Sequence, residues 1–198
     1  MIFLARMLLF LVFSSCTIKH SFVTPTYEEL EKNKLKKIVH YLKPFKSEKS
    51  IKNLYYQISR AYISHHKEYL LITAKRATKL ENIKKLCKLN KKADGILISQ
   101  FEKIDDSKNS IEMRLKSSLY NCPNQKLIWQ TIAENSYAKK EDDLKVLTSS
   151  YVGKLGTKVE NHVAPFYQIT RKLFDTLPNP KLTEDEEEEK LELDSQST

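Results

Sequence analysis

The chain of 198 residues has only three glycines, and this shortage excludes several kinds of site. No two glycines are adjacent, so the sequence contains neither a glycine-rich phosphate-binding loop nor a dinucleotide-binding fingerprint. No serine lies in the Gly-x-Ser-x-Gly elbow of a hydrolase. The histidines lack the His-Glu-x-x-His spacing of a helical zinc peptidase; they are His20, His40, His65, His66 and His162. We therefore expect no catalytic residues, no metal and no cofactor, and a protein that is not an enzyme.

No apolar segment is long enough to span a bilayer, which takes roughly 20 residues. The first apolar run follows Arg6, covers residues 7–13 and is followed by Ser14, Ser15 and Cys16. A basic residue, a short apolar run and small residues before a cleavage point are typical of a secretory signal peptide. We predict that residues 1–15 are removed and that the mature chain begins at Cys16. The alternatives are an ordinary signal peptide ending near a cysteine, and a first helix buried in a cytosolic protein.

The residues around Cys16 resemble the lipobox of bacterial lipoproteins, in which an aliphatic residue, two small residues and a modified cysteine follow one another. Phe13 stands where leucine is usual, and Ser14 and Ser15 fit the pattern. The resemblance implies that Cys16 carries acyl chains, palmitate among them, which hold the protein on a membrane. Each buried methylene contributes about 0.8 kcal/mol, so two or three chains form a stable anchor. The residue after Cys16 is Thr17, not the aspartate that would indicate a different destination. By resemblance to better-known bacteria, Thr17 is compatible with sorting of the lipoprotein to the outer membrane.

Positive and negative charges are unevenly distributed along the chain. Residues 181–198 carry a net charge of −6 and little apolar surface, so we predict a disordered acidic tail. Without that tail and Arg6, the total of +9 becomes +14 for residues 17–180. A domain this basic attracts anionic partners such as lipid head groups or acidic polysaccharides, although the general abundance of lysine and asparagine, a compositional bias, explains the charge better. We expect no binding to nucleic acid, because export and the absence of an RNA-binding signature both argue against it.

Hydrophobic periodicity predicts an α/β (α+β) fold with a mixed sheet of about five strands and helices packed on it. Residues 16–33 are predicted to form a lipidated tether with a short helix, and residues 34–180 a single domain. Its element order is β-α-β-α-β-β-β-α. The strands are expected at about residues 38–42, 69–73, 93–104, 111–120 and 127–133, and the helices at about 47–62, 78–90 and 144–177, the last one broken or bent at Gly153, Gly156 and Pro165.

Two cysteines remain once Cys16 is assigned to lipid. In an oxidising compartment Cys87 and Cys122 form an even pair, and antiparallel pairing of the strands at 93–104 and 111–120 would bring them together. A bridge across about 35 residues would stabilise the fold by roughly 3 to 4 kcal/mol in the chain-entropy model. The alternative is that Cys87 is a small buried apolar residue. The sequence leaves this choice open.

Several short motifs resemble those of small bacterial envelope lipoproteins. They are Ala93-Asp94-Gly95-Ile96-Leu97 at the start of a strand, Lys126-Leu127-Ile128-Trp129 after a hairpin turn, and Thr176-Leu177-Pro178 closing a terminal helix. The resemblance covers about residues 35–178 and implies a fold similar to the N-terminal domain of TolB, to CsgG, to the Pel-secretion lipoprotein and to LpoB. It also implies a non-enzymatic accessory role in the periplasm.

We therefore expect a lipid-anchored protein on the outer membrane, facing the periplasm, that binds an unidentified protein partner of an envelope assembly or secretion system. The alternative is a lipoprotein on the cell surface that binds host or matrix polyanions. The adjacent acids Asp105 and Asp106 could attract a cation, but a solvated turn explains them better because a hard metal needs more carboxylates. Trp129 is expected in the core, where an alternating hairpin face packs against a helix.

Overall fold

The computed structural model describes residues 17–25, 27–73 and 82–195. The predicted signal peptide and Cys16 lie outside these ranges. The strands are β1 (Thr17–Val23), β2 (Lys37–Leu42), β3 (Leu70–Leu71), β4 (Gly95–Asp106), β5 (Ser110–Asn121) and β6 (Leu127–Ala138). The α-helices are α1 (Lys49–His66), α2 (Ile83–Leu89), α3 (Lys145–Leu155), α4 (Glu160–Asp175) and α5 (Glu184–Ser195), with single turns at η1 (Tyr27–Glu31), η2 (Asp142–Leu144) and η3 (Thr157–Val159).

The strands form one mixed sheet in the order β1-β6-β5-β4-β2-β3. The long strands β4, β5 and β6 are antiparallel neighbours, and β1 extends them antiparallel to β6. On the other side, β2 lies parallel to β4, and β3 parallel to β2. The predicted α/β fold with a mixed sheet is confirmed, with six described strands where we expected about five.

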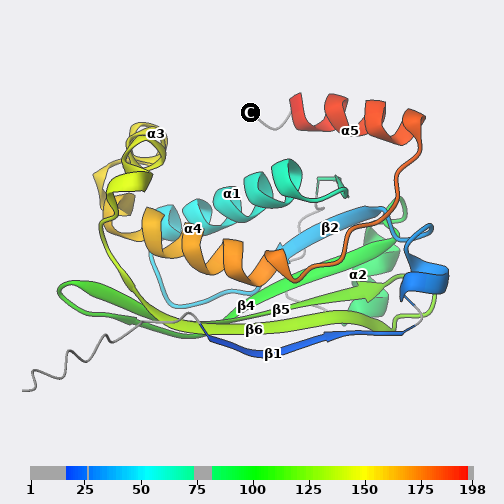
Figure 1. Cartoon of the computed structure of the whole chain (residues 1–198), viewed down its shortest axis with the longest axis horizontal. Helices are drawn as coiled ribbons and strands as arrows, with labels where there is room; N and C mark the ends of the chain where they lie inside the picture. The colour runs from blue at the N-terminus through cyan, green and yellow to red at the C-terminus, as the bar shows by residue number, and fades with distance from the viewer. Residues whose placement is uncertain (1–16, 26, 74–81, 196–198) are drawn as a thin grey trace, which may run out of the picture.

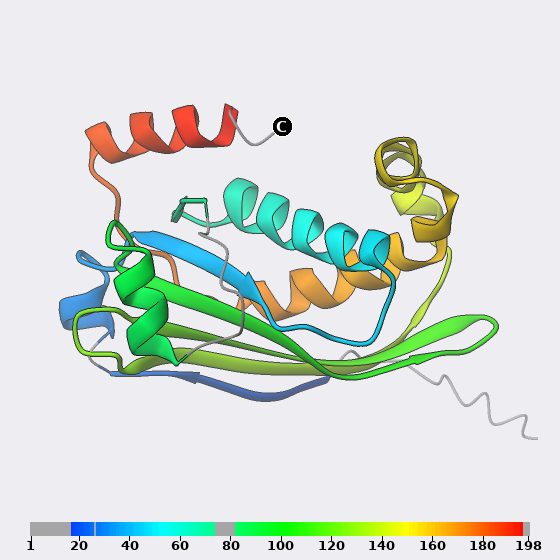
Figure 2. The same cartoon turned by 180° about the vertical axis from the view of Figure 1, so that it is seen from behind.

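Helices cover both faces of this sheet, but unequally (Figures 1 and 2). On one face lie α1 and α4, which enclose the larger hydrophobic core with the inward residues of β5, such as Met113 and Leu115. The short helix α2 covers one end of the other face, where Leu86 packs with Ile96 and Ile98 of β4. At this end β4 is covered on both faces of the sheet, and this burial explains its continuous run of apolar residues. Trp129 is fully buried in the larger core, as predicted.

The predicted break in the last helical segment is confirmed at Gly156, whereas Gly153 lies within α3. Gly156 separates α3 from the turn that leads into α4, and its backbone has φ of 88°, a left-handed conformation that favours glycine. Pro165 lies inside α4 and is buried.

The prediction that residues 16–33 form a tether is wrong for the part after Cys16. Residues 17–23 form the edge strand β1, with Thr17 opposite Glu134 and Val23 opposite Trp129. The hydroxyl groups of Ser21 and Thr131 are hydrogen bonded at 3.0 Å across this pair. The segment is polar enough to resemble a linker, but its backbone groups are satisfied by the otherwise open edge of β6.

The predicted disordered tail is also wrong for Glu184–Ser195, which form α5. Glu186 accepts hydrogen bonds from the backbone and side chain of Thr183, so it caps the start of the helix. The ammonium groups of Lys36 and Lys37 then contact Glu186 at 2.5 Å and Glu189 at 2.7 Å. Figure 1 shows α5 lying above β2, apart from the main helical layer. Ion pairs with the basic domain therefore order a segment that lacks apolar surface of its own.

Candidate functional site

The predicted lipidation site adjoins the folded domain directly. Cys16 lies outside the described residues, but its neighbour Thr17 is the first residue of β1 and pairs with Glu134. No helix in the described part of the chain is long and apolar enough to cross a membrane. An acyl group on Cys16 would thus be separated from the sheet by no linker.

Cys87 and Cys122 are joined by a disulfide, with their Cα atoms 5.5 Å apart. Cys87 lies in α2, and Cys122 follows the last residue of β5. The pairing of β4 with β5 places Gly95 opposite Asn121, and the backbone NH of Cys122 donates to the carbonyl of Asp94 at 2.7 Å. The turn after β5 is therefore held against the segment that connects α2 to β4.

The position of α2 is fixed at both of its ends as well. The side-chain oxygen of Asn82 accepts a hydrogen bond of 3.0 Å from the backbone NH of Lys85 at the start of the helix. At the other end, the amide of Asn90 donates to the carbonyl of Leu86 and to the hydroxyl of Tyr41. A helix of seven residues is not stable alone, so these contacts and the disulfide are what hold it on the sheet.

The outward side of this helix carries a group of exposed lysines. We define the α2 lysine surface as Lys84, Lys88, Lys91 and Lys92, together with Lys126 in the turn that the disulfide ties to α2. Among the described residues, none of these five side chains forms an ion pair. Composition alone could explain the basic charge, and this surface could not be identified from the sequence because the turn and the helix are distant in sequence.

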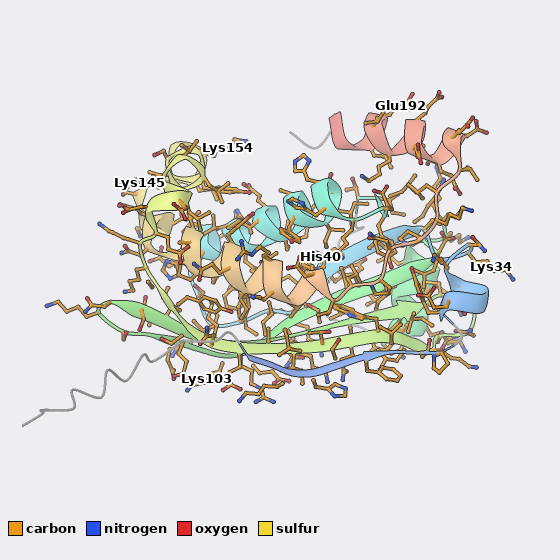
Figure 3. All side chains as sticks on the ribbon, viewed as in Figure 1. Lys34, His40, Lys103, Lys145, Lys154 and Glu192 are labelled. Carbon is orange, nitrogen blue, oxygen red and sulfur yellow. A yellow bond between two sulfur atoms is a disulfide. The ribbon has the colours of Figure 1, made fainter. Side chains whose placement is uncertain are left out.

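Lysines near the other end of the sheet are in a different situation. Asp106 pairs with Lys139 at 2.5 Å, and Lys103 contacts Asp105 and Glu112 at 3.1 and 2.8 Å. Lys145, at the start of α3, pairs with Asp142. Figure 3 shows Lys103, Lys145 and Lys154 toward this end of the molecule and Lys34 toward the opposite end. The opposite end is the one at which Figures 1 and 2 show α2. Lys103, Lys139 and Lys145 are thus neutralised by nearby carboxylates, whereas the lysines of the α2 lysine surface are paired with no carboxylate of the described residues.

A buried polar cluster links α1 to the sheet, and no sequence motif indicates it. Nε2 of His40 is hydrogen bonded to the hydroxyl of Ser99 at 2.9 Å, and Ser99 to that of Ser117 at 2.6 Å. The hydroxyl of Ser59 on α1 lies 3.4 Å from Nδ1 of His40. All four side chains are fully buried. Desolvation, with Arg60 nearby, lowers the pKa of His40 to about 3, so the imidazole is neutral and serves the packing of α1 on β2.

The other polar candidates from the sequence are dispersed. Asp105 and Asp106 are occupied by the lysines described above, and no group of three metal-binding side chains occurs within the described ranges. His65 and His66 are exposed at the end of α1, beside a shallow cavity of about 110 Å³. A wider hollow of about 410 Å³ lies between η2 and α4 and is lined by Asp142, Asp143 and Arg171 among others. Neither hollow brings together the predicted site residues.

Comparison with known proteins identifies the fold. No family model matches the chain, and no curated protein matches it in sequence. Among solved structures, a PelC dodecamer from Paraburkholderia phytofirmans is similar, with a TM-score of 0.52 and 10% identity, over 82% of this chain and 98% of that one. Lipoprotein GNA1162 from Neisseria meningitidis has a TM-score of 0.46 and 15% identity, over 60% of this chain and 96% of that one.

The likeness to PelC establishes the fold alone. The chain shares the α/β fold of a PelC subunit over most of its length. The match agrees with one member of the group named from sequence motifs, the Pel-secretion lipoprotein. The finer likeness to TolB, CsgG and LpoB stays a prediction.

Proposed function

We propose that this chain is a lipid-anchored protein of the bacterial outer membrane that faces the periplasm. It acts there as a non-enzymatic interaction module of an envelope assembly or secretion system. The observation that carries the proposal is the lipobox-like Ser14-Ser15-Cys16 directly before a strand that belongs to the domain. The shared fold with a subunit of the PelC dodecamer supports a role in which the domain works by binding other protein chains.

Replacing the modified cysteine tests the anchor. In the native cells, a Cys16→Ala variant should move from the membrane fraction to the soluble fraction, because it can carry no thioether-linked lipid. A Cys87→Ser/Cys122→Ser variant is the matched control and should stay with the membrane. Intact mass of the native protein should show an acylated chain that begins at residue 16. A product that begins at Met1, or one with a free thiol at residue 16, contradicts the proposal.

The partner is tested by cross-linking and co-purification of the full, lipidated chain from its own membranes. Recovery of the same envelope proteins with wild type and their loss with Cys16→Ala would support an interaction module that works at the membrane. Protease added to intact cells separates the two orientations. Degradation of the wild-type domain under these conditions would favour the cell surface, and with it the alternative role of binding host or matrix polyanions.

A further inference from the structure

We propose that the α2 lysine surface is a binding site for a flexible polyanion, an acidic polysaccharide that presents carboxylate or phosphate groups. Its five side chains are exposed, and none of them is paired with a carboxylate of the described residues. No aspartate or glutamate occurs in residues 82–93 or 121–127. Within the described part of the chain, the positive charge of this surface is therefore not neutralised by an ion pair and is available to a partner.

Among the described residues, the acidic residue that follows Lys91 and Lys92 in sequence is already engaged. Asp94 accepts hydrogen bonds from the backbone NH groups of Lys36 and Lys37, at 3.1 and 2.8 Å, and therefore braces the start of β2. Glu31 is buried and binds the amide of Asn121. These carboxylates are directed into the fold, and they form no ion pairs with the five lysines of the α2 lysine surface.

The surface is also held in place by covalent structure. The disulfide between Cys87 and Cys122 joins α2, which carries Lys84 and Lys88 and is followed by Lys91 and Lys92, to the turn that carries Lys126. Burial of Leu86 and the two asparagine caps orient the same helix. The lysines are thus presented on a backbone that does not have to be ordered when a ligand binds, and this lowers the entropic cost of binding.

The composition of the surface favours a polyanion over a protein. Protein interfaces are enriched in aromatic residues and arginine and depleted in lysine, and this surface has lysines without either. Lysine acts as a mobile point charge, while arginine binds carboxylates in a fixed two-point geometry. Five lysines therefore suit a flexible chain of repeated charges better than a single shaped epitope.

The position of the surface argues against the anchoring membrane as its ligand. The strand β1 runs from Thr17 toward Val23, which lies opposite Trp129 near the start of β6, where the Lys126 turn is located. Seven residues of strand span about 20 Å. This exceeds twice the Debye length of about 8 Å at physiological ionic strength. Figures 1 and 2 show β1 starting near the middle of the sheet and running toward the end that carries α2.

The test uses the purified full chain and polygalacturonate, a polysaccharide with a carboxylate on each sugar. Lys84→Gln/Lys88→Gln/Lys91→Gln/Lys92→Gln should bind it about tenfold more weakly or worse at moderate salt, because four direct charge contacts are lost. The matched control is Lys140→Gln/Lys145→Gln/Lys154→Gln/Lys158→Gln, which removes four exposed lysines elsewhere and should bind within about twofold of wild type. Trp129 fluorescence verifies that each variant is folded.

Equal weakening of both variants would show a response to net charge alone and would overturn the proposal. The absence of polygalacturonate binding by the wild type would overturn it too. Stronger, α2-dependent binding to phosphatidylglycerol vesicles than to the polysaccharide would assign the surface to a membrane and would likewise refute it. The inference rests on the proposed export of the chain, but the measurement does not require an acyl group on Cys16. A failed lipidation test and a failed binding test are therefore distinguishable.

Discussion

Cys87 on α2 and Cys122 after β5 are bonded to each other across a sequence separation of 35 residues. In the native, unreduced protein neither thiol should react with an alkylating reagent. The Cys87→Ser/Cys122→Ser variant should lose about 3 kcal/mol of unfolding free energy, because the unfolded chain regains the entropy of an open loop. Urea unfolding followed by Trp129 fluorescence measures this loss. Reduced wild type should match the variant, and alkylation of both cysteines without reductant would show that the bridge does not form in the cell.

His40 should make stability depend on pH. The folded protein holds its pKa at about 3, far below the 6.5 of an unfolded histidine. Protonation therefore favours the unfolded chain, and the unfolding free energy should fall by several kcal/mol as the pH drops from about 7 to about 3. The pKa of His162 is also lowered by burial and adds in the same direction. Urea titrations at several pH values should show a flatter profile for His40→Gln, while His65→Gln, on the exposed end of α1, should keep the wild-type slope.

The docking of α5 should be electrostatic. Replacing Glu186 and Glu189 with glutamine removes the ion pairs to Lys36 and Lys37, each worth a few tenths to about 1 kcal/mol at a partly exposed site. We expect faster amide hydrogen exchange across residues 184–195 in this variant, and also in wild type at high salt. A Glu187→Gln/Glu188→Gln variant has the same charge but changes only exposed positions. Equal exchange in the two variants would mean that helix propensity, not docking, orders the segment.

Two glycines should respond oppositely to alanine. A Cβ at Gly95 would lie 3.0 Å from the carbonyl oxygen of Tyr120 and 3.2 Å from the side chain of Leu35. Gly95→Ala should therefore destabilise the fold by about 1 to 3 kcal/mol. At Gly153, inside α3, a Cβ meets no atom within 4 Å, so Gly153→Ala should stabilise by about 0.5 to 1 kcal/mol. Thermal unfolding of both variants provides the comparison, and a stabilised Gly95→Ala would refute the close contact at β4.

The central part of the fold could be predicted because its signals are local. The alternation from Ile111 to Leu119 corresponds to the side chains that β5 turns toward α1 and α4. The same reasoning missed β1, since a short polar segment next to Cys16 becomes a strand only when β6 offers it an edge. It missed α5 because the lysines that hold this helix are about 150 residues away. Thr183 and Glu186 do form a capping pattern, and this was the available sign of a helix start.

The candidate site was less predictable than the fold. Neither the cluster around His40 nor the α2 lysine surface follows a sequence motif, because each is assembled from separate elements. Lysine is frequent throughout the chain, so counting could not show that some lysines are neutralised by Asp105 or Asp106, while the five of the α2 lysine surface form no ion pair with the described residues. That difference is a property of the folded surface.

The start of β1 at Thr17 limits how far such a protein can reach. If the preceding residue is embedded in a leaflet through its lipid, there is no slack chain on which the domain could swing outward. Its other end would extend from the bilayer by no more than the length of the domain itself. Whatever it meets must be either embedded in the same membrane or brought close to it, so encounters would take place in a thin layer where a low copy number still gives a high local concentration.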